Sequence, residues 1–205
     1  MSLFITFEGC EGCGKSYQAK ILYKHLLSDN VPVVLTFEPG GTSLGNRVRH
    51  ILKQSKYPIS PETELFLFSA CRAQLMQEVI QPALMAGKVV ICDRFVDSTT
   101  VYQGYGRGLD LQTVFNLNAI SAQCIQPDLT ILLDIPVEAG LGRKKGKKSD
   151  RFDSEEIYFH NRIREGYLIL AELNQKRWYK VDAGLSRSEI SNKIWKRVYS
   201  LLRLE

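Results

Sequence analysis

Eight residues near the beginning of the chain have types and a spacing that suit phosphate chemistry. They run from Gly9 to Ser16 as GCEGCGKS and match the pattern G-x-x-x-x-G-K-[ST]. In this pattern backbone N–H groups surround a phosphate, Lys15 bridges the β- and γ-phosphates, and the Ser16 hydroxyl reaches Mg2+. A strand-like run precedes the motif and a helical pattern follows it, as this mechanism requires. We therefore expect binding of a purine nucleoside triphosphate with Mg2+ and transfer of its γ-phosphoryl group.

Asp93 and Arg94 follow a later apolar run and are the next candidates for phosphate chemistry. The carboxyl end of a parallel strand faces the binding crevice of an open α/β sheet. At that place the Asp93 carboxylate can hold Mg2+ or its water, while the Arg94 guanidinium can form two parallel bonds to a phosphate. The alternative is a solvated ion pair at a strand end, and the phosphate loop makes it the weaker interpretation.

Two further segments suit a nucleoside. Phe68 and Arg72 lie four residues apart, so one helix face could stack a ring on a flat base and donate to a carbonyl on its edge. Alternatively, Phe68 is an ordinary core residue. Residues 98–108 mix hydroxyls, an amide, aromatic rings and glycines, which suits close approach to a sugar and base. Those glycines could also serve only to shape a turn.

A basic run covers residues 143–148 and is followed by Arg151. Such a run is usually a solvated surface loop. Here we expect a cationic lid, because the transition state of phosphoryl transfer spreads charge over the equatorial oxygens. Arg143 and Arg151 are the candidates within it, since a guanidinium suits this task.

The elements that must position these residues alternate along the chain. Short apolar runs predict five buried parallel strands, at residues 3–7, 31–37, 88–92, 129–134 and 178–181. Helical periodicity fills the segments between them. Ser60 before Pro61, Asp110, and the pair Ser186 and Glu189 are typical helix starts. The pattern predicts a doubly wound α/β fold in one domain, residues 1–205.

Composition limits the class of protein. The 205 residues include 27 Lys and Arg against 22 Asp and Glu, a formal net charge of +5. This excess suits an anionic ligand but is small for a dedicated nucleic-acid-binding protein. No apolar stretch is long enough to span a bilayer, and the sequence begins without a signal-peptide pattern. We expect a cytoplasmic protein with neither nucleic acid nor a membrane as its partner.

The five cysteines are scattered and do not resemble a disulfide framework. Cys10 and Cys13 form a Cys-x-x-Cys pair, but no second pair or nearby histidine completes a zinc site. We expect both to be small apolar residues that fit between the loop glycines.

Other classes of phosphate-loop protein fit less well. A GTPase switch would need Asn-Lys-x-Asp and Asp-x-x-Gly; the nearest sequence, residues 192–195, ends in Trp195, and no Asp-x-x-Gly occurs. A nucleic-acid-binding ATPase would be expected to have a second basic block, which is absent from the sequence. Another nucleotide kinase of the same fold, with a different acceptor, is the remaining alternative.

Six sequence blocks together resemble the thymidylate kinase family in order and spacing from end to end: FEGCEGCGKS, FEPGGTSLGNRVR, LFSACRAQ, ICDRFVDSTTVYQGYGRG, SDRFD and VDA. The resemblance implies ATP-dependent, Mg2+-assisted phosphorylation of dTMP to dTDP by a homodimer. It implies the nucleoside monophosphate kinase fold, a three-layer sandwich with a five-stranded parallel sheet flanked by helices. A mobile lid would lie at about residues 137–153.

The motifs and the resemblance together assign residues to roles. The catalytic set is Lys15, Asp93, Arg94, Arg143 and Arg151. The ATP set is Gly9, Cys10, Glu11, Gly12, Cys13, Gly14, Lys15, Ser16, Tyr17 and Asp182. The dTMP set is Glu11, Glu38, Arg49, Phe68, Arg72, Arg94, Ser98, Thr99, Tyr102 and Gln103. The Mg2+ set is Ser16 and Asp93.

Within the family the catalytic arginine lies either in the phosphate loop or in the lid. Gly12 occupies the loop position here, so the chain resembles the lid-arginine type. Phe37, Tyr17 and Phe95 depart from the residues usual in relatives, and Phe37 bears on how the acceptor phosphate is bound. A pocket for the thymine methyl favours dTMP over dUMP by only about 1–3 kcal/mol, whereas Arg72 should reject cytosine more strongly.

Overall fold

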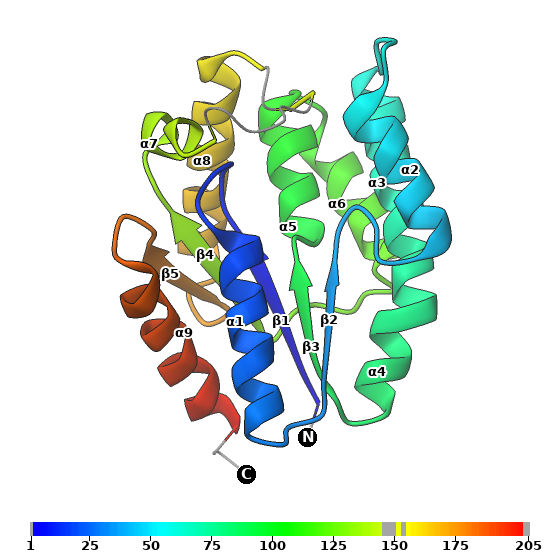
Figure 1. Ribbon diagram of the computed structural model, residues 1–205. Coiled ribbons are helices and arrows are strands. Elements are labelled where there is room, and N and C mark those ends of the chain that lie inside the picture. The colour runs from blue at the N-terminus through cyan, green and yellow to red at the C-terminus, as the bar shows by residue number, and fades with distance from the viewer. Residues whose placement is uncertain (1, 145–150, 153–154, 203–205) are drawn as a thin grey trace.

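A five-stranded parallel sheet forms the centre of the computed structural model, which describes residues 2–144, 151–152 and 155–202. The strands are β1 (Leu3–Glu8), β2 (Val33–Phe37), β3 (Val89–Asp93), β4 (Leu129–Asp134) and β5 (Trp178–Asp182). Their order across the sheet is β2-β3-β1-β4-β5, with Ile5 of β1 aligned with Ile91 of β3 and Leu129 of β4. The first strand is therefore central, and its carboxyl end has neighbours on both sides (Figure 1).

Helices follow each strand and cover both faces of the sheet (Figure 1). They are α1 (Lys15–Ser28), α2 (Ser43–Gln54), α3 (Pro61–Leu75), α4 (Gln81–Met85), α5 (Val96–Thr99), α6 (Leu111–Ser121), α7 (Val137–Gly142), α8 (Ile157–Leu173) and α9 (Arg187–Leu202). Two π-helical turns, η1 (Met76–Ile80) and η2 (Thr100–Gly106), continue α3 and α5. The predicted α/β sandwich is confirmed, and the observed strands differ from the predicted ones by at most two residues at either end.

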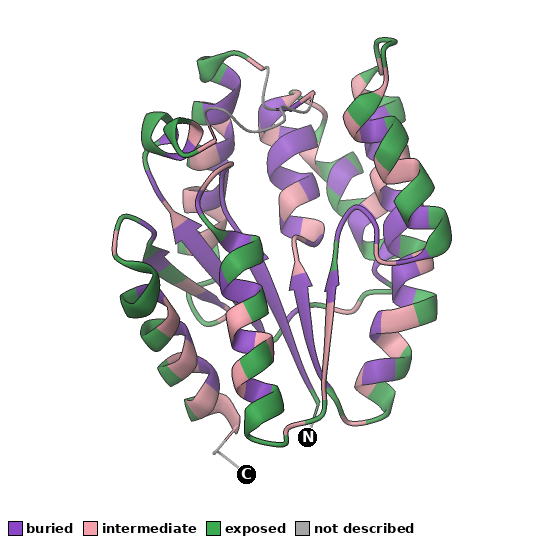
Figure 2. Cartoon of the chain, viewed as in Figure 1, coloured by how far each residue is buried: buried purple, intermediate pink, exposed green. Residues whose placement is uncertain are grey.

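Side chains of β1 alternate between two apolar cores. Ile5 and Phe7 pack with Leu26 of α1 and Ile194 of α9 on one face. Phe4 packs on the other face with the cluster that includes Leu75 and η1. Because each face of the sheet is covered by helices, the central strands β3, β1 and β4 are buried along nearly their whole length, whereas the edge strands β2 and β5 are partly exposed (Figure 2). Burial on both faces explains the continuous apolar runs in the sequence.

The predicted helix starts are confirmed. The Ser60 side chain accepts from the Thr63 amide at 3.2 Å, and the Asp110 carboxylate accepts from the Thr113 amide at 2.8 Å. Ser186 and Glu189 form a reciprocal capping box, with bonds of 3.0 and 3.3 Å.

The sequence did not predict the π-helical turns. Pro82 explains η1, because its missing N–H and its ring prevent a regular α-helical bond with the preceding turn. The widened turn η2 contains Gly104 and Gly106, and it contributes Tyr102 and Gln103 to the region above the sheet.

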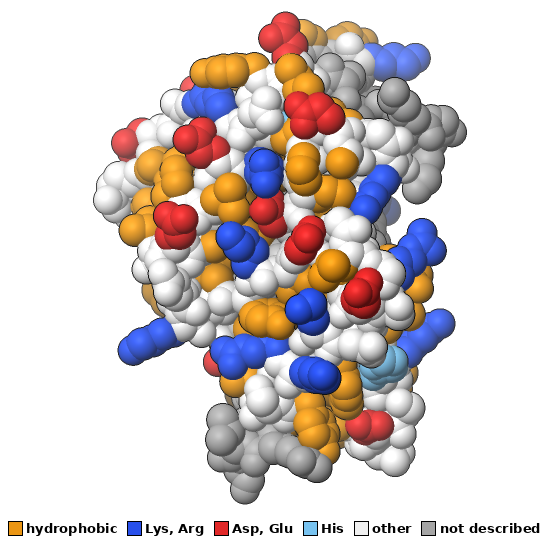
Figure 3. Space-filling model, turned by 90° about the vertical axis from the view of Figure 1, so that its left-hand side faces the viewer, with side chains coloured by type: hydrophobic (Ala, Val, Ile, Leu, Met, Phe, Trp, Pro, Cys, Tyr) orange, Lys and Arg blue, Asp and Glu red, His pale blue; other side chains and the backbone are white. Residues whose placement is uncertain are grey.

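Charged side chains on the face drawn in Figure 3 are mixed, with basic groups standing among acidic and apolar ones. The described residues of this face therefore offer no continuous basic track for a nucleic-acid backbone. Within the described ranges, no helix is both long enough and apolar enough to cross a membrane.

Candidate functional site

A cavity of about 1010 Å³ opens at the carboxyl ends of β1, β2 and β3. Its wall includes the phosphate loop from Glu11 to Ser16, the segment Phe37 to Pro39 after β2, and Asp93 and Arg94 at the end of β3. Residues of η2 and the segment before α9 complete the wall. This volume lies at the upper end of the range for ligand pockets.

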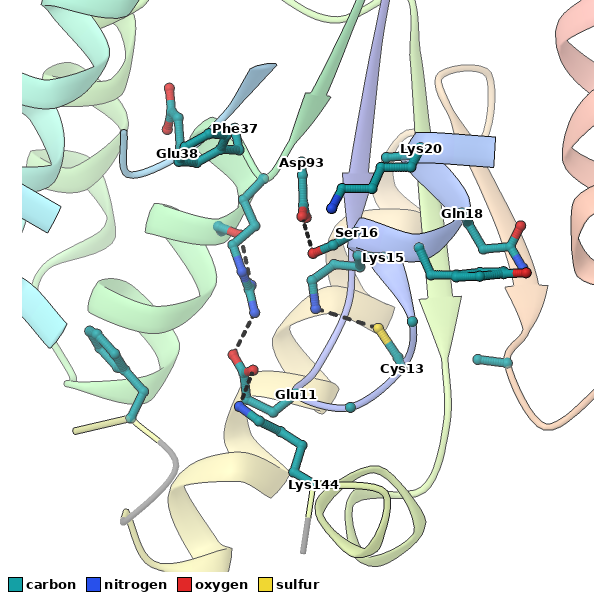
Figure 4. Close-up of a pocket in the computed structure, with 18 of the residues that line it drawn as sticks. Glu11, Cys13, Lys15, Ser16, Gln18, Lys20, Phe37, Glu38, Asp93 and Lys144 are labelled. Atoms are coloured by element: carbon teal, nitrogen blue, oxygen red, sulfur yellow. Dashed lines mark hydrogen bonds and ion pairs between the residues drawn. The ribbon is translucent and has the colours of Figure 1, made fainter. Parts of the chain in front are cut away.

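The phosphate loop has a backbone that only glycine can adopt at its critical points. Gly9 has φ +138°, and a Cβ there would lie 2.4 Å from the Leu133 carbonyl oxygen. Lys15 Nζ donates to the carbonyls of Gly9 at 2.8 Å and Cys10 at 2.7 Å, so the ammonium lies across the loop. Cys13 Sγ is 3.4 Å from the same ammonium (Figure 4). The loop therefore has the tight glycine backbone and the inward-facing ammonium that binding of a phosphate requires.

Ser16 and Asp93 meet beside this loop. The Ser16 hydroxyl donates to Asp93 Oδ2, as Figure 4 shows. Asp93 Oδ1 is buried and has no partner among the described residues. A hydroxyl and a carboxylate with one uncommitted oxygen are the hard oxygen donors that Mg2+ prefers, with phosphates and waters completing its shell. These two residues therefore fit the predicted metal site.

Arg94 has the most extensive set of polar contacts in the cavity wall. Its guanidinium donates to Glu11 Oε1 at 2.5 Å, Tyr102 OH at 3.0 Å and Ser98 Oγ at 3.1 Å. Tyr167 OH of α8 lies 3.3 Å away, and the Tyr102 ring packs under the guanidinium at 4.9 Å. The backbone at Arg94 has φ +75°, a costly conformation that clusters at functional sites. These contacts orient one cation toward the cavity.

Glu11 joins the loop to the beginning of the predicted lid. Its carboxylate pairs with Arg94. It also pairs at 3.2 Å with Lys144, as Figure 4 shows. Burial opposes its ionisation, but the charges of Arg94, Lys15 and Lys144 prevail and hold its pKa below the usual value. Glu11 is therefore an anion at neutral pH and balances part of the positive charge around the loop.

Glu8, at the end of β1, supports Arg94 from below and was not predicted from the sequence. Its fully buried carboxylate accepts from the Phe95 amide at 2.8 Å, Ser98 Oγ at 2.6 Å and Tyr167 OH at 2.8 Å. The same two hydroxyls contact the Arg94 guanidinium. Burial, aided by the charge of Asp97, raises the pKa of Glu8 to about 7.

Arg72 lies behind the cavity wall, whereas Phe68 is part of it. The Arg72 side chain is 0% exposed and donates to Glu38 at 2.7 Å, Thr99 at 2.7 Å and Asn118 at 2.8 Å. Nε also bonds to Glu38, so one of the five guanidinium hydrogens is left without a partner in the described structure. Glu38 and Thr99 line the cavity, and Arg72 fixes both.

Arg49 lies against the unusual Phe37. Its guanidinium is 5.1 Å from the centre of the Phe37 ring, and Nη1 donates to the Pro39 carbonyl at 2.8 Å. Both side chains line the cavity beside Glu38. The Phe37 ring therefore stabilises the Arg49 guanidinium in the cavity wall.

The two lid arginines lie in different places. Arg143 lines the cavity and donates to the Ala183 carbonyl at 3.0 Å. Arg151 lies outside the cavity wall; it donates to the Leu52 carbonyl at 3.1 Å and pairs with Glu64. Lys145, Lys147 and Lys148 of the basic run, together with most of the SDRFD block, lie outside the described residues.

Gly12 shows why the phosphate loop has no arginine at this position. A Cβ on Gly12 would lie 1.9 Å from the Gly140 carbonyl oxygen of α7, and its φ is +72°. A side chain therefore requires α7 to move.

The segment after β5 forms another part of the wall. Asp182 accepts from the Gly184 amide at 2.7 Å, while its neighbours Ala183, Leu185 and Arg187 line the cavity. Arg187 packs over the ring of Tyr17 at 4.8 Å. Asp182 thus shapes the turn without lining the cavity itself, and Leu185 and Arg187 were not predicted from the sequence.

The loop cysteines gain no support for a redox or zinc role. Cys10 and Cys13 are buried in different apolar clusters. Burial, together with the neighbouring Cys13, raises the pKa of Cys10 to about 12, which opposes the reactive thiolate. Phe95, the third departure, is a buried core residue whose ring meets Phe4 at 4.9 Å.

Comparisons with known proteins agree with one another. The thymidylate kinase family model matches residues 7–194. A thymidylate kinase from Dehalococcoides mccartyi strain 195 is 51% identical over 205 residues, covering 100% of this chain and 99% of the relative. One from Geotalea uraniireducens is 47% identical over 190 residues, covering 89% of each. The crystal structure of thymidylate kinase from Ehrlichia chaffeensis superimposes with a TM-score of 0.79 at 34% identity and covers 96% of this chain and 98% of that one.

Replacing Glu8 by Gln should change how stability depends on pH. The native pKa of about 7 exceeds the ordinary value of 4.5, so the folded state retains a proton that the unfolded state has lost between these values. The wild-type free energy of unfolding should therefore fall, relative to that of Glu8→Gln, by about 3 kcal/mol as pH rises from 4.5 to 7.5. Urea unfolding across this range measures the difference.

Glu189→Gln is the matched control. Hydrogen bonds from Ser186 lower the pKa of Glu189, which is exposed at the start of α9, so this carboxyl, unlike Glu8, causes no loss of stability as pH rises. Above pH 5, the free energy of unfolding of Glu189→Gln should depend on pH in the same way as that of the wild type. If the free energies of unfolding of Glu8→Gln and the wild type also depend on pH in the same way, Glu8 is already ionised in the native protein.

Proposed function

The chain belongs to the thymidylate kinase family, and from this membership we propose that it transfers the γ-phosphoryl group of Mg2+-bound ATP to dTMP. One observation carries the proposal: Lys15, the Ser16–Asp93 pair and Arg94 converge on a single cavity that also contains Phe68 and Gln103. Lys15, Ser16, Asp93 and Arg94 suit the reacting phosphates, and Phe68 and Gln103 suit a flat base.

The phosphate loop and Lys15 would hold the β- and γ-phosphates of ATP. Backbone amides and the amino end of α1 supply partial positive charge, and the ammonium adds a full one. Ser16 and Asp93 would hold Mg2+, which bridges phosphate oxygens and neutralises their charge when it is bound. Because phosphoryl transfer depends on positioning and electrostatics, most of the stabilisation of the transition state would come from charged groups that are already in place before the substrates bind.

Arg94 would bind the phosphate of dTMP. It is held by Glu11, Ser98, Tyr102 and Tyr167, so little conformational entropy remains to be lost when a phosphate arrives. A guanidinium fixed in this way can orient the acceptor oxygen for in-line attack on the γ-phosphorus. Glu11 would face the acceptor sugar, as the family resemblance implies.

The other end of dTMP would lie against Phe68. The ring lines the cavity and has Phe152 as a neighbour at 6.1 Å between centroids. We propose that it stacks on thymine, with Ser98, Thr99, Tyr102 and Gln103 around base and sugar and with Glu38 and Arg49 beside the monophosphate. Tyr17, Arg143 and the segment after Asp182 would border the ATP base.

We propose that residues 137–153 form a lid of a single domain and that its basic residues stabilise the transferring phosphoryl group. Support comes from Arg143 and Lys144, which line the cavity at the beginning of this segment. Arg151 is held by Glu64 in the present arrangement, so its participation would require this ion pair to break.

We propose a homodimer. The adjacent helices α2, α3 and α6 present large apolar side chains to solvent, and buried apolar surface is the main source of dimer stability. The exposed residues are Leu44, Ile51, Phe66, Phe115 and Ile120. The three helices lie together on one side of the molecule in Figure 1.

A panel of nucleoside monophosphates tests the acceptor. With ATP and Mg2+, we expect the highest kcat/KM for dTMP and a value for dUMP about 10- to 200-fold lower, because a methyl pocket discriminates only weakly. ADP release is the measurement, and a reaction with EDTA is the blank. If dCMP, dGMP or UMP is used as well as dTMP, another nucleotide kinase is the better description.

Alanine substitutions of Arg143 and Arg151 test the lid. The variant that removes the cation in contact with the transferring group should lower kcat by about 100- to 1,000-fold, with a smaller change in the KM for ATP. Lys196→Ala, an exposed change on α9 outside the cavity wall, is the control. A near-normal kcat in both arginine variants would place the catalytic cation elsewhere.

A further inference from the structure

Three oxygen atoms form a closed ring beneath the Arg94 guanidinium. Glu8 Oε2 lies 2.6 Å from Ser98 Oγ and 2.8 Å from Tyr167 OH, and the two hydroxyls lie 2.9 Å apart. The three residues come from the end of β1, from α5 and from α8. Arg94 donates to both hydroxyls from outside the ring, at 3.1 and 3.3 Å. The ring is therefore the contact through which Glu8 acts on the guanidinium.

This ring has more contacts than its two hydroxyls can supply with hydrogens. A hydroxyl donates one hydrogen bond, so Ser98 and Tyr167 together provide donors for two of the three contacts. The hydrogens of Arg94 reach the hydroxyl oxygens from outside, and the other oxygen of Glu8 is occupied by the Phe95 amide at 2.8 Å. A proton on Oε2 of Glu8 supplies the missing donor. Each of the three oxygens then donates once and accepts once within the ring.

The surroundings of Glu8 also favour its protonated form. Burial, aided by the charge of Asp97, raises its pKa to about 7, although a hydrogen bond from Ser98 and the charge of Arg94 oppose this. The titratable and charged groups that face Glu8 are Cys92 of β3, Arg94 after that strand, Asp97 of α5, Tyr167 of α8 and Arg177 before β5. Arg94 is a cation that stabilises ionised Glu8, whereas the charge of Arg177 is balanced by Asp97 at 2.6 Å.

We propose that Glu8 is a positioning residue for Arg94, and that its carboxylate takes up a proton and closes the ring of hydrogen bonds when the phosphate of the acceptor nucleotide binds to the guanidinium. The inference rests on the proposed function, because it concerns the dTMP phosphate. A phosphate dianion at Arg94 cancels the charge that favours ionised Glu8, so protonation becomes more favourable. The proton comes from the solvent and forms an O–H bond on Oε2. The closed ring then holds Arg94 against the ligand without a second anion beneath it.

Calorimetric titration with dTMP in two buffers of different ionisation enthalpy measures the proton count, because the buffer supplies each proton that the complex takes up. We expect the wild type to take up at least about 0.3 proton per dTMP at pH 7.5, where Glu8 is partly ionised before the ligand binds. The phosphate of dTMP contributes little at this pH, because its second pKa is about 6 and it is already a dianion.

Glu8→Gln removes the titration and retains the shape. The new amide donates at one end and accepts at the other, as a protonated carboxyl does, so it can still bond to the ring hydroxyls and to the Phe95 amide. We expect Glu8→Gln to bind dTMP at least as tightly as the wild type at pH 7.5, because no proton has to be taken up. Its proton count should be lower than that of the wild type by at least about 0.3. A purely structural role for Glu8 would change the affinity and leave the proton count unaltered.

Glu189→Gln, the same chemical change at an exposed position of α9, is the matched control and should bind dTMP with the wild-type proton count. If Glu8→Gln does not fold, the wild type alone decides, and an absence of proton uptake at pH 7.5 overturns the inference. Equal proton counts in the wild type and Glu8→Gln also overturn it and leave the proposed function intact. A wild-type protein that does not bind dTMP overturns both.

Discussion

The guanidinium of Arg94 has to be kept charged, oriented and partly desolvated at the edge of the sheet, and much of the surrounding structure serves this requirement. Glu11 contacts it from the phosphate loop, Tyr102 from η2 and Tyr167 from α8. These residues are far apart in the chain and come together only because β1 and β3 are neighbours with their carboxyl ends at the same edge. The central position of the first strand thus decides where acceptor chemistry can occur.

Two carboxylates on either side of Arg94 have opposite electrostatic environments. Neighbouring cations hold the pKa of Glu11 low, whereas burial and Asp97 raise the pKa of Glu8. Glu11 therefore provides permanent charge balance. Glu8 acts chiefly through hydrogen bonds to Ser98 and Tyr167, the hydroxyls that also contact the guanidinium. These hydrogen bonds hold Ser98, Tyr167 and the guanidinium together as one layer at the floor of the cavity.

The close approach of Gly12 to Gly140 brings the Gly9–Ser16 loop against α7. The space that a side chain at position 12 would need is filled by α7, which accounts for the absence of an arginine there. Lys144, two residues after α7, donates to Glu11 of the same loop at 3.2 Å.

Local signals made the fold and the conformation of the Gly9–Ser16 loop predictable. The glycine spacing from Gly9 to Gly14, the helix caps and the apolar strands each depend on nearby sequence, and the structure confirms them. The contacts of Glu8 and Glu64 join segments that are distant in sequence, and such contacts cannot be predicted from hydrophobic periodicity. Weak signals did exist, since Glu8 is an acidic residue that directly precedes the loop and Glu64 lies four residues before Phe68 on the same helix face. The commitment of Arg72 to Glu38 required the three-dimensional structure.

The central claim is that Arg94 is a preorganised clamp for the acceptor phosphate, and the affinity of dTMP relative to thymidine tests it most directly. Calorimetric titration of the wild type and of Arg94→Lys with both ligands isolates the phosphate contribution, because Lys retains the charge but loses the planar fork. This substitution should narrow the preference for dTMP over thymidine by about 10- to 100-fold, the equivalent of one lost charge-assisted hydrogen bond. An unchanged preference, with thymidine and dTMP weakened alike or not at all, would contradict it.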